Sequence, residues 1–498
     1  MIKYYILLFF TIYAHAHYWD SLKIIEDNID DDIDPCDDFY RHMCARNKPE
    51  ETTWSRLLHK AYYEEIDDIV KKNIPDKLSE LMAQGYRIIH SGYSVVPLKV
   101  LQENYVEICQ KNSTEALFFL QTLESFFGRE ATEPCWGYLC FTNLAMDSDC
   151  QQASETLAKG ANTLLNRLKI NSAQNVEYLQ RTYNNKLASM WSLLHQDEFK
   201  RVHEMFTFFK EELLKSIQKT PWLLNSNTME VFYNITSRMR LNLQQKEIKE
   251  TFNNILTHQL SYDTCVNTFS SLGIFANEYC VLYSLPKYKE KHDLTQANAF
   301  NKHPEIMFMN QYVSTLSDNG SIALKYGSVG AILGHEMGHS VIMSDLSDGF
   351  YPYYSKEINP CVQQQFNETC NVFKEGSCEV QENQVDENGS DIFGFQFAYD
   401  RLKQIMGDKI NEKIAESKRN MTNAQGFFYA VFPGGCQRGD VYAPKYNPFG
   451  HGANNVRVNA RVIQVPDFGK VFNCSKNSRM MLSKTKQCHI FGESAPQH

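Results

Sequence analysis

The segment Gly330-Ala-Ile-Leu-Gly-His335-Glu336-Met-Gly-His339-Ser340 contains the pattern His-Glu-x-x-His after an apolar lead-in. Residues four apart lie on one face of an α-helix, so a helix here aims the imidazoles of His335 and His339 at one point. Glu336 is turned by about 100° from His335 and flanks that point without having to ligate a metal. Two neutral nitrogen ligands, an open position for water and a nearby carboxylate are what a zinc hydrolase requires. The same pentapeptide also arises by chance, so a third ligand in the right context has to support it.

The composition predicts a folded protein of two or more domains. The chain has 498 residues, of which 43% are hydrophobic, and a net charge of −9. That length exceeds one ordinary core, and the apolar fraction is large enough to bury several. No basic stripe is present, so we expect no nucleic-acid partner. The cysteine count, 14, is even and indicates disulfides formed in an oxidising compartment.

The N-terminus indicates export. An early Lys3, an apolar run and the small residues Ala14 and Ala16 predict a signal peptide over residues 1–16. The protein is therefore expected to be secreted and extracellular, with a signal anchor at the cell surface as the alternative. No later segment is long and apolar enough for a stable membrane span. In a secreted chain the Asn-x-Ser/Thr sequons predict glycans, and one sequon, Asn388-Gly-Ser390, lies within an acidic motif at residues 386–391.

Periodicity predicts helices first and short strands later. One helical stripe is expected in the range 176–194, and a second is formed by Val202, Met205, Phe209, Leu213 and Ile217. Residues 298–300 and 306–309 indicate short strands with a turn at His303-Pro304. The acidic segment 26–38 is expected to be solvated.

A second acidic motif supplies a candidate third ligand. Glu387 and Asp391 are four apart, so a helix places both carboxylates on one side. Glu387 would complete a His, His, Glu zinc site, and Asp391 would accept the far ring N–H of a ligand histidine. Two solvated acids on a surface helix are the alternative. The flanking apolar residues favour a partly buried helix, in which unpaired carboxylates are costly.

A third group of polar residues follows near the C-terminus. His451 and Arg457 fit the roles of oxyanion donor and clamp for a substrate carboxylate.

Taken in order, these motifs resemble the neprilysin and endothelin-converting-enzyme family of zinc metallopeptidases. The similar segments are Pro35-Cys36-Asp-Asp-Phe-Tyr, Asn298-Ala299-Phe300, Tyr326 to Glu336, Glu387-Asn388-x-x-Asp391, His451 with Arg457, and Cys474 to Phe491. Several ordered motifs are far more specific than His-Glu-x-x-His alone.

The resemblance implies a role for each motif. His335, His339 and Glu387 would ligate one Zn²⁺ per chain, and Glu336 would be the general base. Asp391 would orient His335, His451 would stabilise the tetrahedral intermediate and Arg457 would hold the substrate. Asn298 and the Ala299 backbone would bind the peptide as an added strand. The implied disulfides are Cys36–Cys474, Cys44–Cys436 and Cys361–Cys488.

The implied fold is mainly α with a small β component: a thermolysin-like catalytic domain disulfide-linked to a helical lid domain. After the signal peptide, residues 17–60 are expected to pack on the catalytic domain, 61–270 to form a shortened lid and 271–498 to form the catalytic domain. Several residues depart from the family pattern. Ser340-Val341-Ile342 follow the second histidine, where the family usually has a small residue and then Phe-Asp. Gly389-Ser390 replace Ile-Ala, and Phe449 stands two residues before His451, where an acidic residue is expected.

The leading hypothesis is a secreted zinc endopeptidase that cleaves peptides on the amino side of apolar residues. The alternative is a catalytically impaired secreted homologue that binds peptides or a protein partner, because the departures adjoin the zinc ligands. The oligomeric state stays open.

Overall fold

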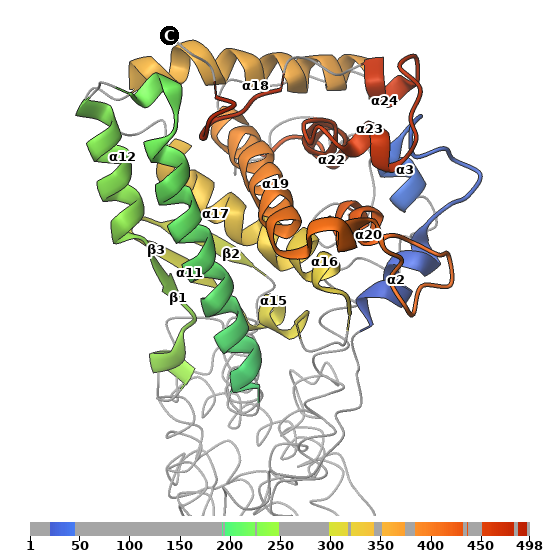
Figure 1. Ribbon diagram of the computed structural model, residues 1–498, viewed down its shortest axis with the longest axis horizontal. Coiled ribbons are helices and arrows are strands. Elements are labelled where there is room, and N and C mark those ends of the chain that lie inside the picture. The colour runs from blue at the N-terminus through green and yellow to red at the C-terminus, as the bar shows by residue number, and fades with distance from the viewer. Residues whose placement is uncertain are drawn as a thin grey trace, which may run out of the picture. The chain divides into compact units, whose positions relative to one another are not determined.

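The structure is a computed structural model, shown in Figure 1. It describes residues 20–44, 192, 195–224, 227–248, 298–316, 320–342, 351–373, 384–431, 436, 451–482 and 487–495. The expected signal peptide and the helical stripe within 176–194 lie outside these residues, apart from Ser192.

The described part is mostly helical with one small sheet, as the sequence predicts. Its elements in chain order are α2 (Ser21–Asn28), α3 (Phe39–Cys44), α11 (Gln196–Gln218), η1 (Pro221–Leu223), α12 (Asn227–Arg238), β1 (Arg240–Asn242), β2 (Ala299–Lys302), β3 (Glu305–Phe308), α15 (Asn310–Ser314), α16 (Ile322–Lys325), η3 (Tyr326–Gly330), α17 (Ala331–Ile342), α18 (Tyr351–Phe373), α19 (Val385–Met406), η5 (Gly407–Asn411), α20 (Asn423–Tyr429), α22 (Asn454–Ile463), α23 (Phe468–Val471) and α24 (Arg479–Leu482).

Two compact units divide the chain. One comprises residues 1–65, 192–245 and 296–498, and the other comprises 66–191 and 246–295. All elements named above belong to the first unit. Helices α11 and α12 lie within the range 61–270 expected for the lid, yet they pack in the unit that holds α17. Nearly all the rest of that range lies outside the described residues, so its boundaries stay a prediction.

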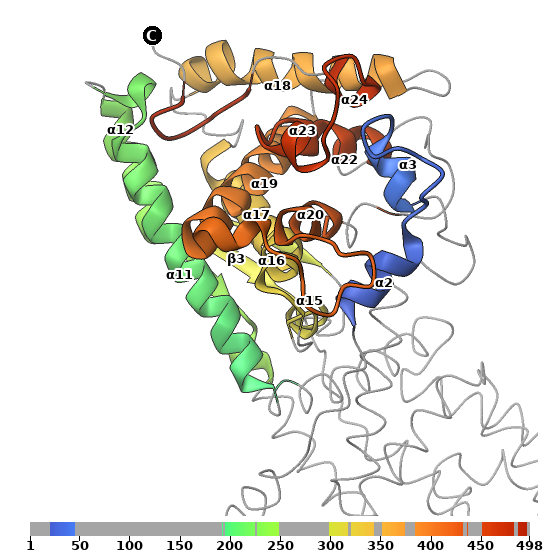
Figure 2. The ribbon, with the colours of Figure 1, turned by 45° about the vertical axis from the view of Figure 1, so that its right-hand side comes forward.

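The tight pairing of α17 and α19 forms the centre of the first unit, as both ribbon views show (Figures 1 and 2). The two helices cross where Gly334 faces Gly394. A Cβ atom added to Gly334 would lie 2.9 Å from the backbone of Gly394. Only glycine allows such an approach, and it brings the helix that carries the two histidines close to the helix that carries Glu387.

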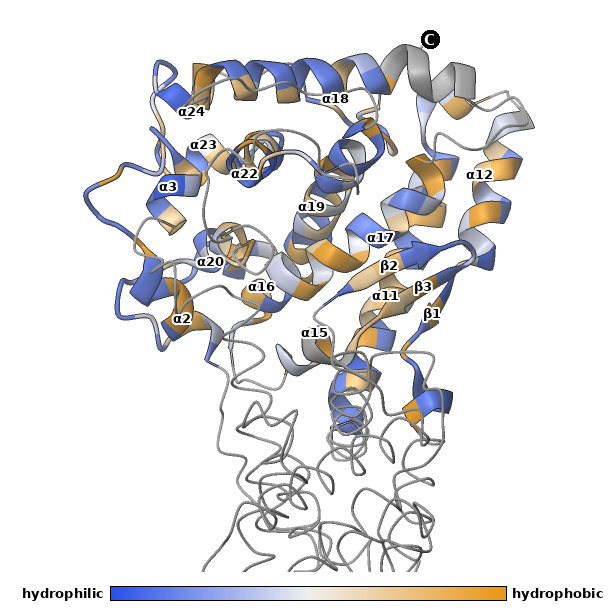
Figure 3. Ribbon diagram, turned by 180° about the vertical axis from the view of Figure 1, so that it is seen from behind, coloured by the Kyte–Doolittle hydropathy of each residue, from blue (hydrophilic) through white to orange (hydrophobic). Residues whose placement is uncertain are grey.

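Apolar faces hold the surrounding helices on this pair. The predicted stripe of α11 is buried: Val202, Met205, Phe209, Leu213 and Ile217 are each less than 9% exposed. Blue and orange segments alternate along α12, as expected for a helix with one buried face (Figure 3). Helix α18 packs on α19 and α22.

The sheet has the strand order β1-β3-β2, with β3 parallel to β1 and antiparallel to β2. The predicted strands at 298–300 and 306–309 therefore exist as β2 and β3, joined at His303-Pro304. Strand β2 also packs on α17, which brings it beside the metal-binding motif.

Disulfides join the N-terminal segment to the end of the chain. The structure forms all three expected bonds, Cys36–Cys474, Cys44–Cys436 and Cys361–Cys488. Ring stacking of Phe39 on Tyr429 adds an apolar contact between α3 and α20.

The expectation of a solvated acidic segment is wrong for two of its residues. Glu26 is 6% exposed and accepts hydrogen bonds from Ser417 Oγ and from the N–H of Arg419. Asp38 is also 6% exposed and accepts a hydrogen bond from Asn459 Nδ2. These acids fasten the N-terminal segment, which lies along the loop before α20 in Figure 2. Buried carboxylates need such partners, and the charge pattern alone did not reveal them.

Within the described residues, no helix combines the length and hydropathy needed to cross a membrane.

Candidate metal centre

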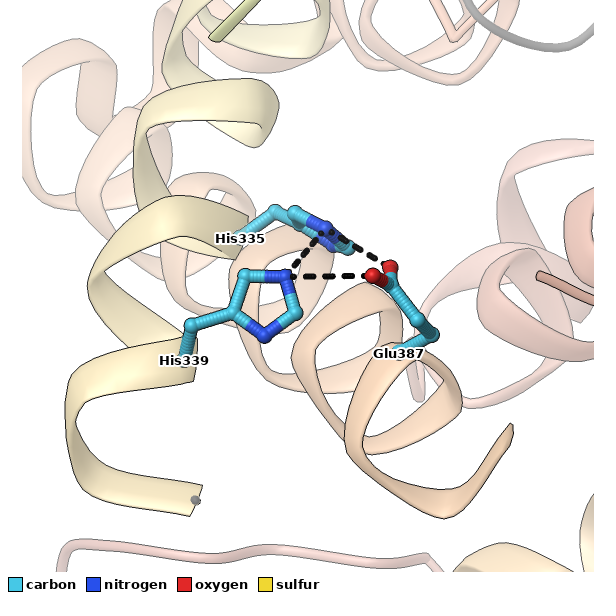
Figure 4. A group of neighbouring side chains, drawn as sticks. All are labelled: His335, His339 and Glu387. Carbon is cyan, nitrogen blue, oxygen red and sulfur yellow. Dashed lines mark hydrogen bonds and ion pairs between the residues drawn. The ribbon is translucent and has the colours of Figure 1, made fainter. Parts of the chain in front are cut away.

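Three side chains from two helices converge on one point. His335 and His339 come from α17, and Glu387 comes from the first turn of α19, as Figure 4 shows. Their ligand atoms lie within 4.8 Å of one another. His335 Nε2 is 3.0 Å from His339 Nε2 and 3.3 Å from Glu387 Oε2, and His339 Nε2 is 3.6 Å from Glu387 Oε1.

The donor set fits a zinc ion. Zinc–ligand distances of about 2.0–2.1 Å in a tetrahedron place the ligand atoms about 3.3 Å apart, which is close to the three separations above. Two imidazoles and one carboxylate leave the fourth position of a tetrahedral site open, as catalytic sites require. The two Nε2 atoms also face each other at 3.0 Å. Without a metal, one N–H between the two nitrogens forms a hydrogen bond at this distance, whereas a bound cation allows both lone pairs to point inward.

Asp391 supports His335 from behind. Its Oδ1 lies 3.1 Å from His335 Nδ1, which leaves Nε2 to point at the metal position. Arg457 donates to the same carboxylate from Nε at 2.6 Å and from Nη2 at 2.9 Å. Burial alone would raise the pKa of Asp391, but Arg457, His335 and Arg461 outweigh it and hold that pKa well below its usual value. The carboxylate is therefore ionised and oriented on both sides.

Glu336 lies beside the two histidines and is only 6% exposed. Burial, helped by the negative charge of Glu387, raises the pKa of Glu336 to about 7, although His335 and Arg457 oppose this. A carboxylate whose pKa lies near neutrality can both accept and release a proton.

His451 is held near the third ligand. Its Nε2 lies 3.0 Å from Glu387 Oε2, and Gln384 Nε2 donates to its carbonyl at 3.4 Å. Phe449, which replaces the expected carboxylate, lies outside the described residues. The structure thus brings His451 to the metal centre, where its imidazole contacts Glu387.

The Arg457 guanidinium already binds a carboxylate of the protein, in contrast to the expected role of holding a substrate. Both of the donors named above bind Asp391, and its Nη2 is 3.8 Å from Glu387 Oε2. Its role toward a substrate stays a prediction.

Strand β2 offers an open edge in the part of the chain that the structure describes, because the order is β1-β3-β2. Met309 N donates a hydrogen bond to Asn298 O at 3.1 Å, so the Asn298 carbonyl points toward the chain that continues from β3. Alternate residues of an antiparallel pair turn their peptide groups the other way, which directs those of Ala299 and Asn301 away from β3. Oδ1 of Asn298 accepts a hydrogen bond from Ala299 N at 3.0 Å. An extended peptide can pair with such an edge.

Two residues at the centre were not assigned a role from the sequence. Asn301 Nδ2 donates to Glu336 O and to Ser340 Oγ, both at 2.6 Å, and so joins β2 to α17. Ser390 Oγ lies 3.2 Å from His339 Nδ1. The spacing of Ser390, three residues after Glu387 on one helix, could have indicated the second contact. Nothing local in the sequence indicates the first.

Comparison with known proteins supports the same assignment. The model of peptidase family M13 matches residues 298–488, and no curated protein matches the chain. The zinc metalloprotease Zmp1 of Mycobacterium tuberculosis, solved with an inhibitor, is 12% identical with a TM-score of 0.54, covering 96% of this chain and 100% of that one. A galactose-containing glycoprotein complex from Haemonchus is 13% identical with a TM-score of 0.54 and the same coverage. At these identities the likeness shows a shared fold alone. Residues 298–488 thus match peptidase family M13, the neprilysin and endothelin-converting-enzyme family of zinc metallopeptidases.

Proposed function

We propose that the protein is a secreted zinc endopeptidase that cleaves peptides on the amino side of apolar residues, with one Zn²⁺ per chain. The observation that carries this proposal is the convergence of His335, His339 and Glu387 beside the buried Glu336. Ligands, an open position and a carboxylate base are the parts that metal-assisted hydrolysis requires.

Each residue has a defined task in this reaction. Bound zinc supplies the Lewis acidity that activates water and polarises the scissile carbonyl. Glu336 accepts the proton of the attacking water and delivers it to the leaving amine. His451 donates a hydrogen bond to the developing oxyanion once the substrate separates it from Glu387. Asp391 keeps the N–H of His335 on Nδ1 throughout the cycle.

The substrate is proposed to bind as an added strand. Within the described residues, the edge of β2 that faces away from β3 presents the Ala299 carbonyl and the Asn301 peptide group, which supports this arrangement, and Asn298 would hold the chain at one end. Main-chain pairing explains how such an enzyme accepts varied sequences, because side-chain pockets then set only the preference.

The disulfide bonds, and not the metal centre, support the proposal that the protein is secreted. Disulfides persist in oxidising compartments, and three of them close loops across the described unit.

A single substitution tests the proposal. Glu336→Gln keeps the size of the side chain and removes its basicity. It should lower peptide turnover by at least about 100-fold while the zinc content stays at one ion per chain. Turnover is measured by mass spectrometry on a peptide library, and zinc by elemental analysis. Glu416→Gln, which makes the same change on an exposed side chain, is the matched control and should behave as wild type.

Two results would overturn this function. One is a Glu336→Gln protein that cleaves the library as fast as wild type. The other is a wild-type protein that holds stoichiometric zinc, cleaves no library peptide and shows no difference on adding a chelator. The second result would favour the peptide-binding alternative.

A further inference from the structure

Ser390 occupies a buried position between the two helices of the metal centre. It lies in α19, its side chain is 0% exposed, and its Oγ is 3.2 Å from His339 Nδ1. The close approach depends on Gly338 in α17. A Cβ atom at residue 338 would lie 3.2 Å from both Cα and Oγ of Ser390. The serine hydroxyl is therefore packed directly against the second histidine.

That contact has a chemical consequence for His339. A neutral imidazole carries one N–H and one lone pair, so binding a metal through Nε2 requires the proton on Nδ1. A buried N–H needs an acceptor, and Ser390 Oγ stands in hydrogen-bonding position. Asp391 does the same for His335, at 3.1 Å from its Nδ1. The two ligand histidines thus have separate partners in one turn of α19.

We propose that Ser390 is a positioning residue of the metal centre, which holds His339 in the tautomer and ring orientation that bind zinc. This inference rests on the proposed zinc site. It assigns a task to a residue that departs from the family pattern, because alanine is expected at position 390. A purely packing role is the competing explanation, since the tight crossing at Gly338 also demands a small side chain.

The substitution Ser390→Ala separates the two explanations, because alanine fits the same space and lacks only the hydroxyl. Partners of metal-binding histidines contribute about 10- to 100-fold to metal affinity, and a neutral hydroxyl belongs at the lower end. We expect the zinc dissociation constant, measured by competition with a chromophoric chelator, to rise about 10-fold. The absorption bands of the Co²⁺-loaded protein should also change, because the ligand field depends on how His339 is held.

Ser328→Ala is the matched control. Ser328 lies in η3, immediately before α17, and its hydroxyl donates to Leu324 O at 2.8 Å without contacting a ligand. Its zinc affinity and cobalt spectrum should equal those of wild type.

The melting temperature of the metal-free protein completes the test. If Ser390 positions His339 for zinc, Ser390→Ala lowers the melting temperature of the zinc-loaded protein by more than that of the metal-free protein, so the increase that zinc produces becomes smaller. The proposal is overturned if Ser390→Ala binds zinc as tightly as wild type, or if it destabilises the metal-free and zinc-loaded proteins equally. A wild-type protein that binds no zinc overturns this inference and the proposed function together. A wild-type protein that binds zinc but cleaves no peptide overturns only the proposed function.

Discussion

Replacing Gly394 by alanine should disrupt the crossing of α17 and α19 and, with it, the metal centre. The new Cβ atom would lie 2.3 Å from His335 N, 2.7 Å from His335 Cα and 2.8 Å from Ala331 O. All three are backbone atoms, so no side-chain rotation relieves the overlap. Contacts of Cβ atoms essentially never fall below 3.0 Å. The two helices must therefore separate by at least 0.7 Å, the difference between 3.0 Å and 2.3 Å.

The size of the effect follows from that displacement. Overpacking a well-filled core costs about 1–3 kcal/mol, and a clash between two helix backbones belongs at the upper end. For a unit of about 320 residues the unfolding entropy is about 0.7 kcal/mol/K, so about 3 kcal/mol corresponds to a loss of roughly 4 °C in melting temperature. Metal–ligand distances tolerate only about 0.2 Å, so moving His335 away from Glu387 should also weaken zinc binding.

Thermal unfolding and chelator competition measure both effects, with Gly330→Ala as the matched control. Gly330 precedes α17, and the atoms nearest to a Cβ atom there would be Met205 Sδ and Phe209 Cζ at 3.5 Å and Tyr326 Cβ at 3.6 Å, which is ordinary contact. The control should be as stable as wild type or up to about 1 kcal/mol more stable. The reasoning is refuted if Gly394→Ala unfolds at the same temperature as Gly330→Ala and binds zinc equally well.

Three further outcomes follow from the described contacts. Asn301→Ala should lower kcat about 10- to 100-fold with zinc content unchanged, because its amide joins β2 to the Glu336 carbonyl; equal kcat values would contradict this. Asn388 is 1% exposed and should carry no glycan in zinc-bound protein, whereas Asn420 is exposed; glycopeptide mapping decides, and full occupancy at Asn388 would be the contrary result. Burial lowers the pKa of His42, so the unfolded chain binds its proton first as pH falls below about 6.5, and stability declines there. Melting temperatures between pH 7 and 5 should fall less steeply in His42→Gln, and parallel curves would refute the assignment.

The metal ligands could be predicted because their spacing is local. His335 with His339, and Glu387 with Asp391, are each four residues apart on one helix, so helical periodicity alone orients each pair. That the two pairs meet came from the family resemblance, since spacing within one helix does not say which other helix it crosses. The close pairing of Gly334 with Gly394, which sets the crossing, involves two ordinary-looking glycines.

Contacts between segments that are far apart in the sequence could not be predicted in this way. Glu26 lies 393 residues before Arg419 and accepts a hydrogen bond from its backbone N–H. No periodic pattern in the sequence connects the two residues. An acidic segment is usually solvated, so its composition predicted exposure for side chains that are buried. Asn301 is similar: strand alternation predicts only which face it occupies, and not that its amide reaches Glu336 and Ser340.

Two serines in the segments that depart from the family pattern, Ser340 and Ser390, have partners within the site. Ser340 accepts a hydrogen bond from Asn301, and Ser390 contacts His339. A site decaying without function would be expected to leave new buried polar groups unsatisfied, and each such group costs about 1–3 kcal/mol. Here the Ser390 hydroxyl contacts a ligand histidine, and the Ser340 hydroxyl contacts Asn301, which joins the proposed substrate strand to α17. We therefore interpret both serines as parts of a rearranged but intact support for the metal centre, which favours the peptidase over the impaired binder.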